Sequence, residues 1–253
     1  MLSLKRWEDI IKLLERDGSV DVTTLSKIFD VTSKTIRQDL TKLETMGLLE
    51  RVHGGAILKQ TKNAVFPIQQ RKQKYLAEKQ RIAHAALKHI AEGDTIILDG
   101  GSTTFELAKL MGEKKVVVIT NDLNITGELL KKENITLYLT GGKLRREGVY
   151  TLLGRDAVRS MFRYHANKLF LATSALDFEQ GLMVLSEEEA EIKRAMIKVA
   201  KEIVALVDYS KFNQLAFTSF TGVEKINILI TDDRIPETDQ SKLLGLGIKL
   251  DIV

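Results

Sequence analysis

In the C-terminal two thirds of the chain, short and almost continuous apolar runs are separated by stretches with helical periodicity. Unbroken apolar runs are typical of strands buried on both faces of a mostly parallel sheet. The runs span residues 96–98, 116–119, 135–139, 169–172, 203–207, 226–230 and 248–253. Helices are expected over about 79–91, 103–111, 122–132, 153–163 and 186–201. The alternation predicts an α/β domain over 79–253 that binds ligands at the carboxyl ends of its strands.

Residues 1–58 show a different pattern, which predicts three short helices followed by a hairpin. Apolar side chains recur at helical spacing over 7–15, and glycines flank the expected helices. The expected boundary residues are Gly18, Thr23 or Thr24, Thr32 or Ser33, and Gly47. The hairpin is expected over LLERVHGGAIL, residues 48–58, with its turn at the two glycines.

The third expected helix, SKTIRQDLTKLETMG, has an apolar stripe and a polar face. Ile36, Leu40 and Leu43 fall at i, i+4 and i+7, so they must point inward. A polar second helix after a tight turn, followed by a hairpin, is the arrangement of a winged helix-turn-helix. Arg and Gln can read base edges, while hydroxyls and lysines hold phosphates. The candidate DNA-binding residues are Ser33, Lys34, Thr35, Arg37, Gln38, Lys42, Arg51 and His53.

Charge counts leave two interpretations open at this end of the chain. Residues 1–58 hold nine Lys and Arg against nine Asp and Glu, so a protein-interaction domain with a merely solvated polar face is an alternative. Residues 59–78 form a basic linker, and from 59 to 81 seven cations face the single acid Glu78. This segment is either a solvated connection or a basic collar that raises affinity for nucleic-acid phosphate without sequence preference.

The stretch LDGGSTTFELA, from residue 98, has the composition of an anion cradle. Two glycines after a strand allow close backbone approach, and hydroxyls stand where a helix N-terminus offers a partial positive charge. Asp99 is placed to accept hydrogen bonds from sugar hydroxyls. The alternative is a plain strand-to-helix connection.

Other strand ends add amides, glycines and cations to the same edge of the expected sheet. Together they predict a site for a phosphorylated sugar, although Lys211 could equally be a surface lysine. The candidate effector-binding residues are Asp99, Gly100, Gly101, Ser102, Thr103, Thr104, Thr120, Asn121, Gly141, Gly142, Arg145 and Lys211.

Residues 31–56, VTSKTIRQDLTKLETMGLLERVHGGA, resemble the N-terminal signature of the DeoR family of bacterial transcriptional repressors. That signature has a valine–serine start, Thr-(Val/Ile)-Arg-Arg-Asp-Leu, Leu-Glu and a His-Gly-Gly-Ala wing. The chain departs from it at Thr32, where the family usually has Ser, and at Gln38, where it usually has Arg. Both positions lie on the expected reading helix, so relatives do not predict the operator sequence.

The resemblance continues through LDGGSTTFELA, VITNDLNI, LTGGKLR, LLGRDA and VDYSKF, which are similar to the effector domain of DeoR-type regulators. That domain is similar in fold to ribose-5-phosphate isomerase and to the glucosamine-phosphate deaminase and CoA-transferase group. The resemblance implies a repressor of a sugar-catabolism operon, released from operator DNA by a phosphorylated sugar or sugar acid. It also implies a homo-oligomer, a dimer or a tetramer, because operator symmetry follows protein symmetry.

An enzyme of the isomerase type would need a carboxylate base in the loop after the central strand. The segment ATSALD, residues 172–177, stands there instead of an acidic loop. We therefore expect binding without catalysis. A sugar-phosphate isomerase or deaminase with an accessory helical domain is the alternative, and a CoA- or nucleotide-binding protein is a third possibility.

The bulk composition excludes several classes of protein. The chain of 253 residues has no cysteine, and its four histidines show no metal-ligand spacing, so neither disulfides nor a metal site are expected. The glycine-rich loop matches neither GxxxxGK[ST] nor GxGxxG, so no ATP, NAD or other cofactor is expected. No secretory signal or membrane-spanning run is visible, and a cytoplasmic location is expected. The net charge of +4 is too mild to indicate nucleic acid by itself.

Overall fold

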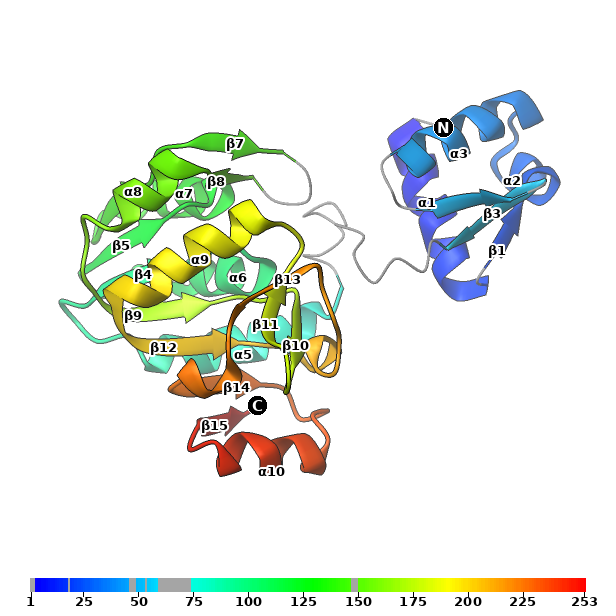
Figure 1. Cartoon of the computed structure of the whole chain (residues 1–253). Helices are drawn as coiled ribbons and strands as arrows, with labels where there is room; N and C mark the ends of the chain where they lie inside the picture. Colours follow the sequence, from blue (N-terminus) through cyan, green and yellow to red (C-terminus); the bar gives the residue numbers. More distant parts are fainter. Residues whose placement is uncertain (1–2, 18, 46–48, 53, 59–73, 147–149) are drawn as a thin grey trace. The chain divides into compact units, whose positions relative to one another are not determined.

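The computed structural model describes residues 3–17, 19–45, 49–52, 54–58, 74–146 and 150–253 (Figure 1). The chain divides into two compact units, Met1–Phe66 and Pro67–Val253, and each is described by itself. Among the described helices, none combines the length and the apolar composition needed to cross a membrane.

The N-terminal unit consists of three helices and a three-stranded antiparallel sheet of order β1-β3-β2. Its elements are α1 (Ser3–Asp17), β1 (Ser19–Asp21), α2 (Val22–Phe29), α3 (Ser33–Thr45), β2 (Leu49–Val52) and β3 (Gly55–Leu58). The hairpin prediction is confirmed, because β2 and β3 pair from Leu49↔Leu58 to Val52↔Gly55. The short strand β1 was not predicted, since three residues carry no readable alternation. Ile36, Leu40 and Leu43 join the core of this unit, as their spacing required.

Two helix starts in this unit are decided by side-chain caps. The expectation of a Thr23 or Thr24 cap on α2 is wrong: Asp21 is the cap, and its carboxylate accepts a hydrogen bond from the Thr24 N–H at 2.8 Å. For α3, the Thr32 hydroxyl accepts from the Thr35 N–H at 3.2 Å, so one of the two expected caps is confirmed. The expected stops at Gly18 and Gly47 lie outside the described residues.

The C-terminal unit is built on a seven-stranded sheet in which all neighbouring pairs are parallel. Its order is β15-β14-β12-β9-β4-β5-β6, and all seven predicted strands are in it. The strands are β4 (Thr95–Leu98), β5 (Val116–Thr120), β6 (Ile135–Leu139), β9 (Ala166–Leu171), β12 (Ala200–Leu206), β14 (Ile228–Thr231) and β15 (Lys249–Ile252).

Helices cover both faces of this sheet, which explains the unbroken apolar runs. In β4, Ile97 packs into one core with α8 and α9, while Ile96 and Leu98 pack into the opposite core with α5, α6 and α7. Figure 1 shows α8 and α9 in front of the sheet and α5 and α6 behind it. The helices are α5 (Leu76–Lys88), α6 (Ser102–Leu110), α7 (Leu123–Leu129), α8 (Arg155–Met161), α9 (Glu187–Val199) and α10 (Glu237–Gly245).

Two small antiparallel sheets and two 3-10 turns complete the unit, and the apolar pattern did not predict them. The sheets have the orders β10-β11-β13 and β7-β8. Their elements are β7 (Lys143–Arg145), β8 (Thr151–Leu153), β10 (Ala175–Asp177), β11 (Gly181–Val184) and β13 (Thr218–Thr221), with turns η1 (Tyr209–Lys211) and η2 (Val223–Lys225). Helix α10 was not predicted either, and α5 begins at Leu76, ahead of its expected start at residue 79.

The strand order contains a topological switch between β4 and β9. From β4 the chain proceeds outward through β5 and β6, then returns to the other side of β4 and proceeds through β9, β12, β14 and β15. In open α/β sheets, ligands bind outside the carboxyl ends of the strands at such a switch. The predicted cradle directly follows β4 and therefore lies at this position.

Candidate functional site

The start of α6 has the geometry of an anion-binding helix terminus. The helix begins at Ser102, and its N-cap, Gly101, provides no side-chain hydrogen bond. Ser102, Thr103 and Thr104 are nevertheless buried. The first amides of a helix have no intrahelical partner, so a buried and uncapped start favours an anionic ligand. Nine residues of α6 also give this terminus a helix dipole.

The two glycines before α6 allow the backbone to approach its neighbours closely. A Cβ at Gly101 would lie 2.7 Å from the Ala172 Cβ, and one at Gly100 would lie 2.5 Å from the Thr151 Cγ2. A side chain at either position would push β4 away from β9 or from β8. The strand–Gly–Gly–helix sequence is therefore explained by packing at the switch.

Polar atoms without a partner gather around the neighbouring strand ends. The Asn121 side chain donates to the Leu152 carbonyl at 3.1 Å, and this bond leaves its Oδ1 as a free acceptor. The Asn121 Oδ1 lies 3.6 Å from the Cβ position of Gly100. Two buried hydroxyls, of Thr140 and Thr151, are also unpartnered among the described residues. Because buried polar groups are normally hydrogen-bonded, these three atoms indicate a ligand or ordered water.

Asp99, which directly follows β4, is held in a buried ion pair. Its Oδ2 accepts a hydrogen bond from the Ala172 N–H at 2.9 Å and pairs with the Lys193 ammonium. Lys193 also donates to the Ala172 carbonyl at 2.9 Å. Both side chains are only 2% exposed. The expected role of Asp99 toward sugar hydroxyls stays a prediction, and in this structure the carboxylate joins the ends of β4 and β9.

Burial dominates the electrostatics of the acidic groups near the switch. It raises the pKa of Asp99, although the Lys193 charge opposes the shift. It also raises the pKa of Asp122, whose carboxylate caps α7 by accepting from the N–H groups of Asn124 and Ile125. Both carboxylates are therefore more easily protonated than an exposed aspartate.

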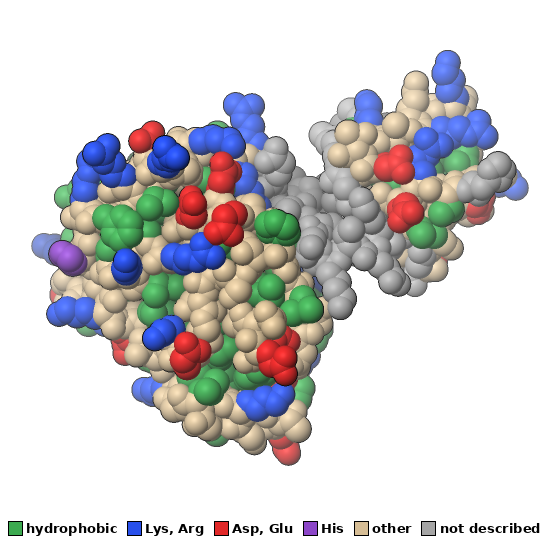
Figure 2. All heavy atoms as spheres, in the orientation of Figure 1, with side chains coloured by type: hydrophobic (Ala, Val, Ile, Leu, Met, Phe, Trp, Pro, Cys, Tyr) green, Lys and Arg blue, Asp and Glu red, His purple; other side chains and the backbone are tan. Residues whose placement is uncertain are grey.

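A chain of charged side chains links the β7–β8 hairpin to this pair. Arg145 pairs with Glu189 at 2.8 Å, and both side chains are largely buried. Glu189 lies one helical turn before Lys193 on α9. At the acidic start of α9, Glu187, Glu188 and Glu189 each form an ion pair. Figure 2 shows acidic and basic side chains interspersed over the α8–α9 face.

Sequence reasoning missed the residues that reach the switch from distant segments. These are Lys193 and Glu189 from α9, Thr151 from β8, Thr140 after β6, and Asp122 before α7. For Glu189 and Lys193, the only signal in the sequence was their i,i+4 spacing, which places the two side chains on the same face of a helix. The pairing of β8 beside the end of β5, through the Asp122↔Thr151 bridge, left no trace in the apolar pattern.

The other predicted effector residues lie at carboxyl ends of the same sheet. Thr120 ends β5, and its hydroxyl donates to the Leu98 carbonyl at 2.7 Å, so it is already used inside the sheet. Gly141 and Gly142 follow β6. Lys211 ends the η1 turn after β12, two strands from β4 in the sheet order. The structure thus places these four residues at or after the carboxyl ends of strands in the same sheet.

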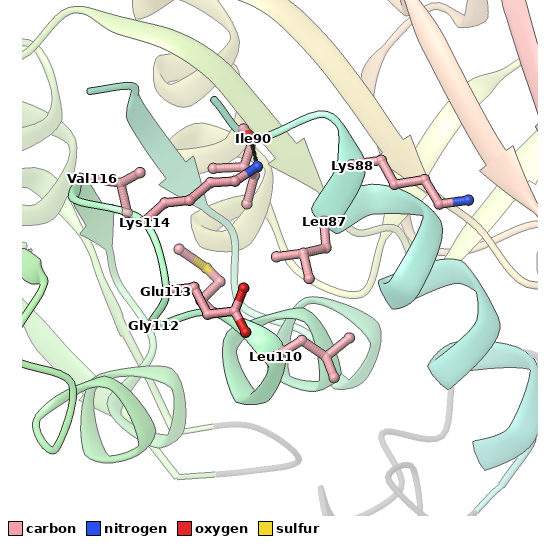
Figure 3. A pocket seen from close by; sticks show the side chains of 9 residues that line it. Leu87, Lys88, Ile90, Leu110, Gly112, Glu113, Lys114 and Val116 are labelled. Carbon is pink, nitrogen blue, oxygen red and sulfur yellow. Dashed lines mark hydrogen bonds between the residues drawn. The ribbon is translucent and has the colours of Figure 1, made fainter. Parts of the chain in front are cut away.

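A cavity lies at the opposite ends of the strands and does not belong to this site. This cavity of about 210 Å³ opens between the ends of α5 and α6, with Val116 of β5 at its wall. Figure 3 shows Leu87 and Leu110 among the side chains that line it, and the Lys114 ammonium hydrogen-bonded to the Ile90 carbonyl. Since Val116 begins β5, this cavity is at the amino ends of the strands.

On the N-terminal unit, α3 presents the predicted polar face. Lys34, Arg37, Gln38 and Lys42 are exposed, and Ser33 and Thr35 are partly exposed. Arg51 on β2 is exposed and donates to the Thr41 hydroxyl at 3.0 Å, which ties the hairpin to α3. His53 and the basic linker over residues 59–73 lie outside the described residues.

Family models match most of the chain. Residues 6–62 match a DeoR-like helix-turn-helix domain, and residues 74–233 match the DeoR C terminal sensor domain. The chain belongs to the DeoR family. It is a DNA-binding transcriptional regulator with a C-terminal sensor domain.

Curated relatives of this DeoR-family regulator match over nearly their full length. A putative aga operon transcriptional repressor of Escherichia coli O157:H7 is 36% identical over 98% of this chain and 93% of the relative. The HTH-type transcriptional repressor GlcR of Bacillus subtilis (strain 168) is 32% identical over 99% of this chain and 96% of the relative.

Solved structures give weaker likenesses to the DeoR-family regulator. The full-length sorbitol operon regulator SorC from Klebsiella pneumoniae matches with a TM-score of 0.41 and 13% identity, over 95% of this chain and 98% of that one. Ribose 5-phosphate isomerase A from Methanocaldococcus jannaschii matches with a TM-score of 0.38 and 20% identity, over 53% of each chain. Scores this low transfer no activity.

Proposed function

We propose that this regulator represses a sugar-catabolism operon in the cytoplasm and leaves its operator when a phosphorylated sugar or sugar acid binds the C-terminal unit. The observation that carries the effector site is the buried, uncapped start of α6 at the topological switch. The helix terminus suits the phosphate. The unpartnered Asn121 Oδ1 suits a hydroxyl, because an acceptor needs a donor and a phosphate dianion has none.

In the N-terminal unit, we assign base reading to Arg37 and Gln38. Both are exposed on α3, whose inward face is fixed by Ile36 and Leu40. An arginine can donate two hydrogen bonds to a guanine edge in the major groove. Ser33, Lys34 and Thr35 near the start of the helix contact phosphates in this assignment, as do Lys42, Arg51 and His53.

We further propose that the sensor unit catalyses no reaction. Isomerisation requires a carboxylate aimed at the carbon beside a carbonyl. In the ATSALD segment, the Asp177 carboxylate instead accepts hydrogen bonds from the Glu179 and Gln180 N–H groups, both at 2.9 Å. The Thr173 hydroxyl donates within the same segment, to the Ala175 carbonyl at 2.7 Å. These carboxylate and hydroxyl groups hold a turn.

The test is a titration of the full-length protein on labelled DNA from upstream of its own operon, followed by sugar phosphates. We expect specific binding and release by one class of sugar phosphate, with no isomerase or deaminase turnover. Absence of specific DNA binding would contradict the repressor assignment, and turnover would contradict the absence of catalysis.

Two variants separate the functions of the two units. Arg37→Ala should weaken specific operator binding by about 1–3 kcal/mol and leave effector binding unchanged. Lys211→Ala should blunt release by the effector and leave operator binding intact. Arg159→Ala and Lys198→Ala, exposed cations of α8 and α9, are the matched controls and should change neither property.

A further inference from the structure

Strand β6 borders the seven-stranded sheet, and no strand of the described residues pairs with its outer side. Its main packing partners are β5 on the inner side and α7. A bare strand edge is a template for pairing with another chain, and proteins usually protect such edges.

The backbone of β6 presents free hydrogen-bonding groups on this edge. The Asn134 carbonyl accepts from Val116 and the Thr140 N–H donates to Thr120, so residues 134, 136, 138 and 140 face β5. The backbone N–H and carbonyl groups of Ile135, Leu137 and Leu139 therefore point away from β5, toward the free side of the strand. The Ile135 N–H already donates to the Lys132 carbonyl. In the described part of the chain, no hydrogen bond satisfies the N–H or carbonyl of Leu137 or Leu139.

The two edges of the sheet differ in their protection. Strand β15 at the other edge carries Lys249 and Asp251, and the Asp251 carboxylate lies 3.6 Å from the His89 Nε2. Charged side chains of this kind discourage edge pairing. Strand β6 reads Ile-Thr-Leu-Tyr-Leu and has no charge, proline or glycine.

Exposed apolar side chains surround the unprotected edge. Tyr138 is 44% exposed and Leu139 is 38% exposed on β6 itself. The Tyr138 ring lies 5.5 Å from the Tyr164 ring, between centroids. Exposed apolar groups gathered at one place indicate a contact surface.

We infer that this edge pairs with the β6 edge of a second copy of the chain, antiparallel and around a two-fold axis. A two-fold contact requires a surface that complements itself. An uncharged strand edge meets this requirement, because it offers both donors and acceptors and brings no like charges together. A helix-turn-helix regulator also needs a second copy to contact two half-sites of an operator. The pairing joins the two sheets into one and does not depend on which effector is bound.

We place the two-fold axis of this pairing at Leu137. With the axis at Leu137, its N–H and carbonyl exchange hydrogen bonds with the partner's Leu137. Each Leu139 N–H then reaches the carbonyl of the partner's Ile135, whose own N–H is already used by Lys132. Thr136 of one copy faces Tyr138 of the other, a favourable pair of β-branched and aromatic side chains.

The proposed β6–β6 contact can be tested by placing a positive charge first on β6 and then on β15, the strand at the other edge of the sheet. Leu139→Lys should weaken self-association about tenfold or more, because a lysine must be placed in the contact. Ile252→Lys, at a position 40% exposed on the opposite edge, is the matched control and should leave association unchanged. Light scattering and sedimentation of the full chain report the mass against the monomer value of 28.4 kDa.

A proline pair tests the backbone itself. The Leu137 N–H faces outward, so Leu137→Pro removes a donor from the contact and none from the β5–β6 ladder. Leu250→Pro makes the same change on β15, where Lys249 and Val253 face β14. Leu137→Pro should lower the measured mass from that of the native oligomer to that of the next smaller species, whereas Leu250→Pro should leave the mass unchanged. A monomeric native protein, or an oligomer that both β6 variants leave unchanged, would overturn the proposal.

The absence of native cysteine allows the register to be read directly. Chains carrying Thr136→Cys and Tyr138→Cys should form a disulfide when mixed and oxidised, because these positions face each other across the axis. Neither chain should cross-link with itself. Self-linkage of the Tyr138→Cys chain would place the axis at Tyr138 and overturn the register.

Discussion

Lys193 joins three groups at the switch: the Asp99 carboxylate, the Ala172 carbonyl and, at 5.5 Å from its centroid, the Phe220 ring. Its ammonium therefore fixes the ends of β4 and β9 beside the start of α6. A buried ion pair adds little net stability, yet loss of one partner is costly because a bare charge remains. Asp99 was predictable from its place after a strand, whereas Lys193 was not, since a helical lysine is ordinarily exposed.

Lys193→Met should destabilise the C-terminal unit by about 3–5 kcal/mol, because the Asp99 carboxylate is left buried without its counterion. Burial raises the pKa of Asp99, and removal of Lys193 raises it further. A raised carboxyl pKa means that the folded state gains stability as the pH falls. The stability deficit of Lys193→Met should therefore shrink as the pH falls from neutrality toward the ordinary aspartate pKa of 3.8.

Urea unfolding followed by circular dichroism measures this deficit. Asp99→Asn/Lys193→Met, which removes both charges, is the matched control and should be markedly more stable than Lys193→Met alone. If the single and double variants were equally unstable, the charge argument would fail and packing would explain the loss.

Asp21 should give the N-terminal unit a pH-dependent stability. The hydrogen bonds from Thr24, from its hydroxyl and then from its N–H, lower the pKa of Asp21. A lowered carboxyl pKa stabilises the fold above the ordinary value of 3.8, and the contribution is lost as the pH falls through the lower, folded-state pKa. Asp21→Asn should therefore be less stable at neutral pH and equal to the native protein in acid.

The single tryptophan, Trp7, lies in α1, so its fluorescence in urea follows the N-terminal unit alone. Asp30→Asn makes the same chemical change at the other end of α2 and serves as the control. A difference between the native protein and Asp21→Asn that persists into acid would rule out the titration of Asp21 as its cause.

At the scale of elements, the two faces of α3 have different roles. Its outward face holds the predicted reading residues, and its inward face is fixed to α1. Asp39 is buried and accepts hydrogen bonds from the Arg6 Nε and the Trp7 Nε1, both at 2.6 Å. The helical spacing predicted the apolar inward residues but not this carboxylate, because only the packing of α1 shows that partners meet it.

Asp39→Ala should destabilise the N-terminal unit by about 3 kcal/mol, since it removes the acceptor that the buried Arg6 cation shares with the partly buried Trp7 indole N–H. Trp7 fluorescence in urea measures the change. Glu44→Gln on the same helix, at an exposed position, should cost less than about 1 kcal/mol. Equal effects of the two substitutions would argue that the hydrogen bonds of Asp39 to Arg6 and Trp7 do not hold α3 against α1.

At the scale of the whole molecule, the proposed repression combines three parts: the reading helix, the sensor site and self-association. Each helix-turn-helix contacts one half-site, so affinity for a two-fold operator depends on joining two copies. The effector can act only through a difference in its affinity for DNA-competent and DNA-incompetent states.

Leu139→Lys should therefore reduce operator affinity at least about tenfold while effector affinity stays at the native value. Fluorescence anisotropy on operator DNA and calorimetric titration with the sugar phosphate measure the two quantities. Ile252→Lys should change neither. Loss of effector binding together with DNA binding would indicate damage to the sensor unit itself.

The amino-acid pattern was enough to predict the seven parallel strands, the helix-turn-helix and the strand–Gly–Gly–helix turn after β4. These are local patterns: apolar runs mark strands buried on two faces, and strand ends mark ligand positions. Segments such as β7, β8, β10 and β11 were not readable, because three- or four-residue strands take their pairing from partners distant in the chain.

Which side chains meet at the site depends on how distant segments pack together. Strand order brought β9 beside β4, and α9 then placed Lys193 on Asp99, 94 residues away in sequence. The same order left β6 at an unprotected edge, while β15 took the edge with charged side chains. Periodicity specifies which face of an element is buried, but neighbours far apart in sequence are fixed by packing alone.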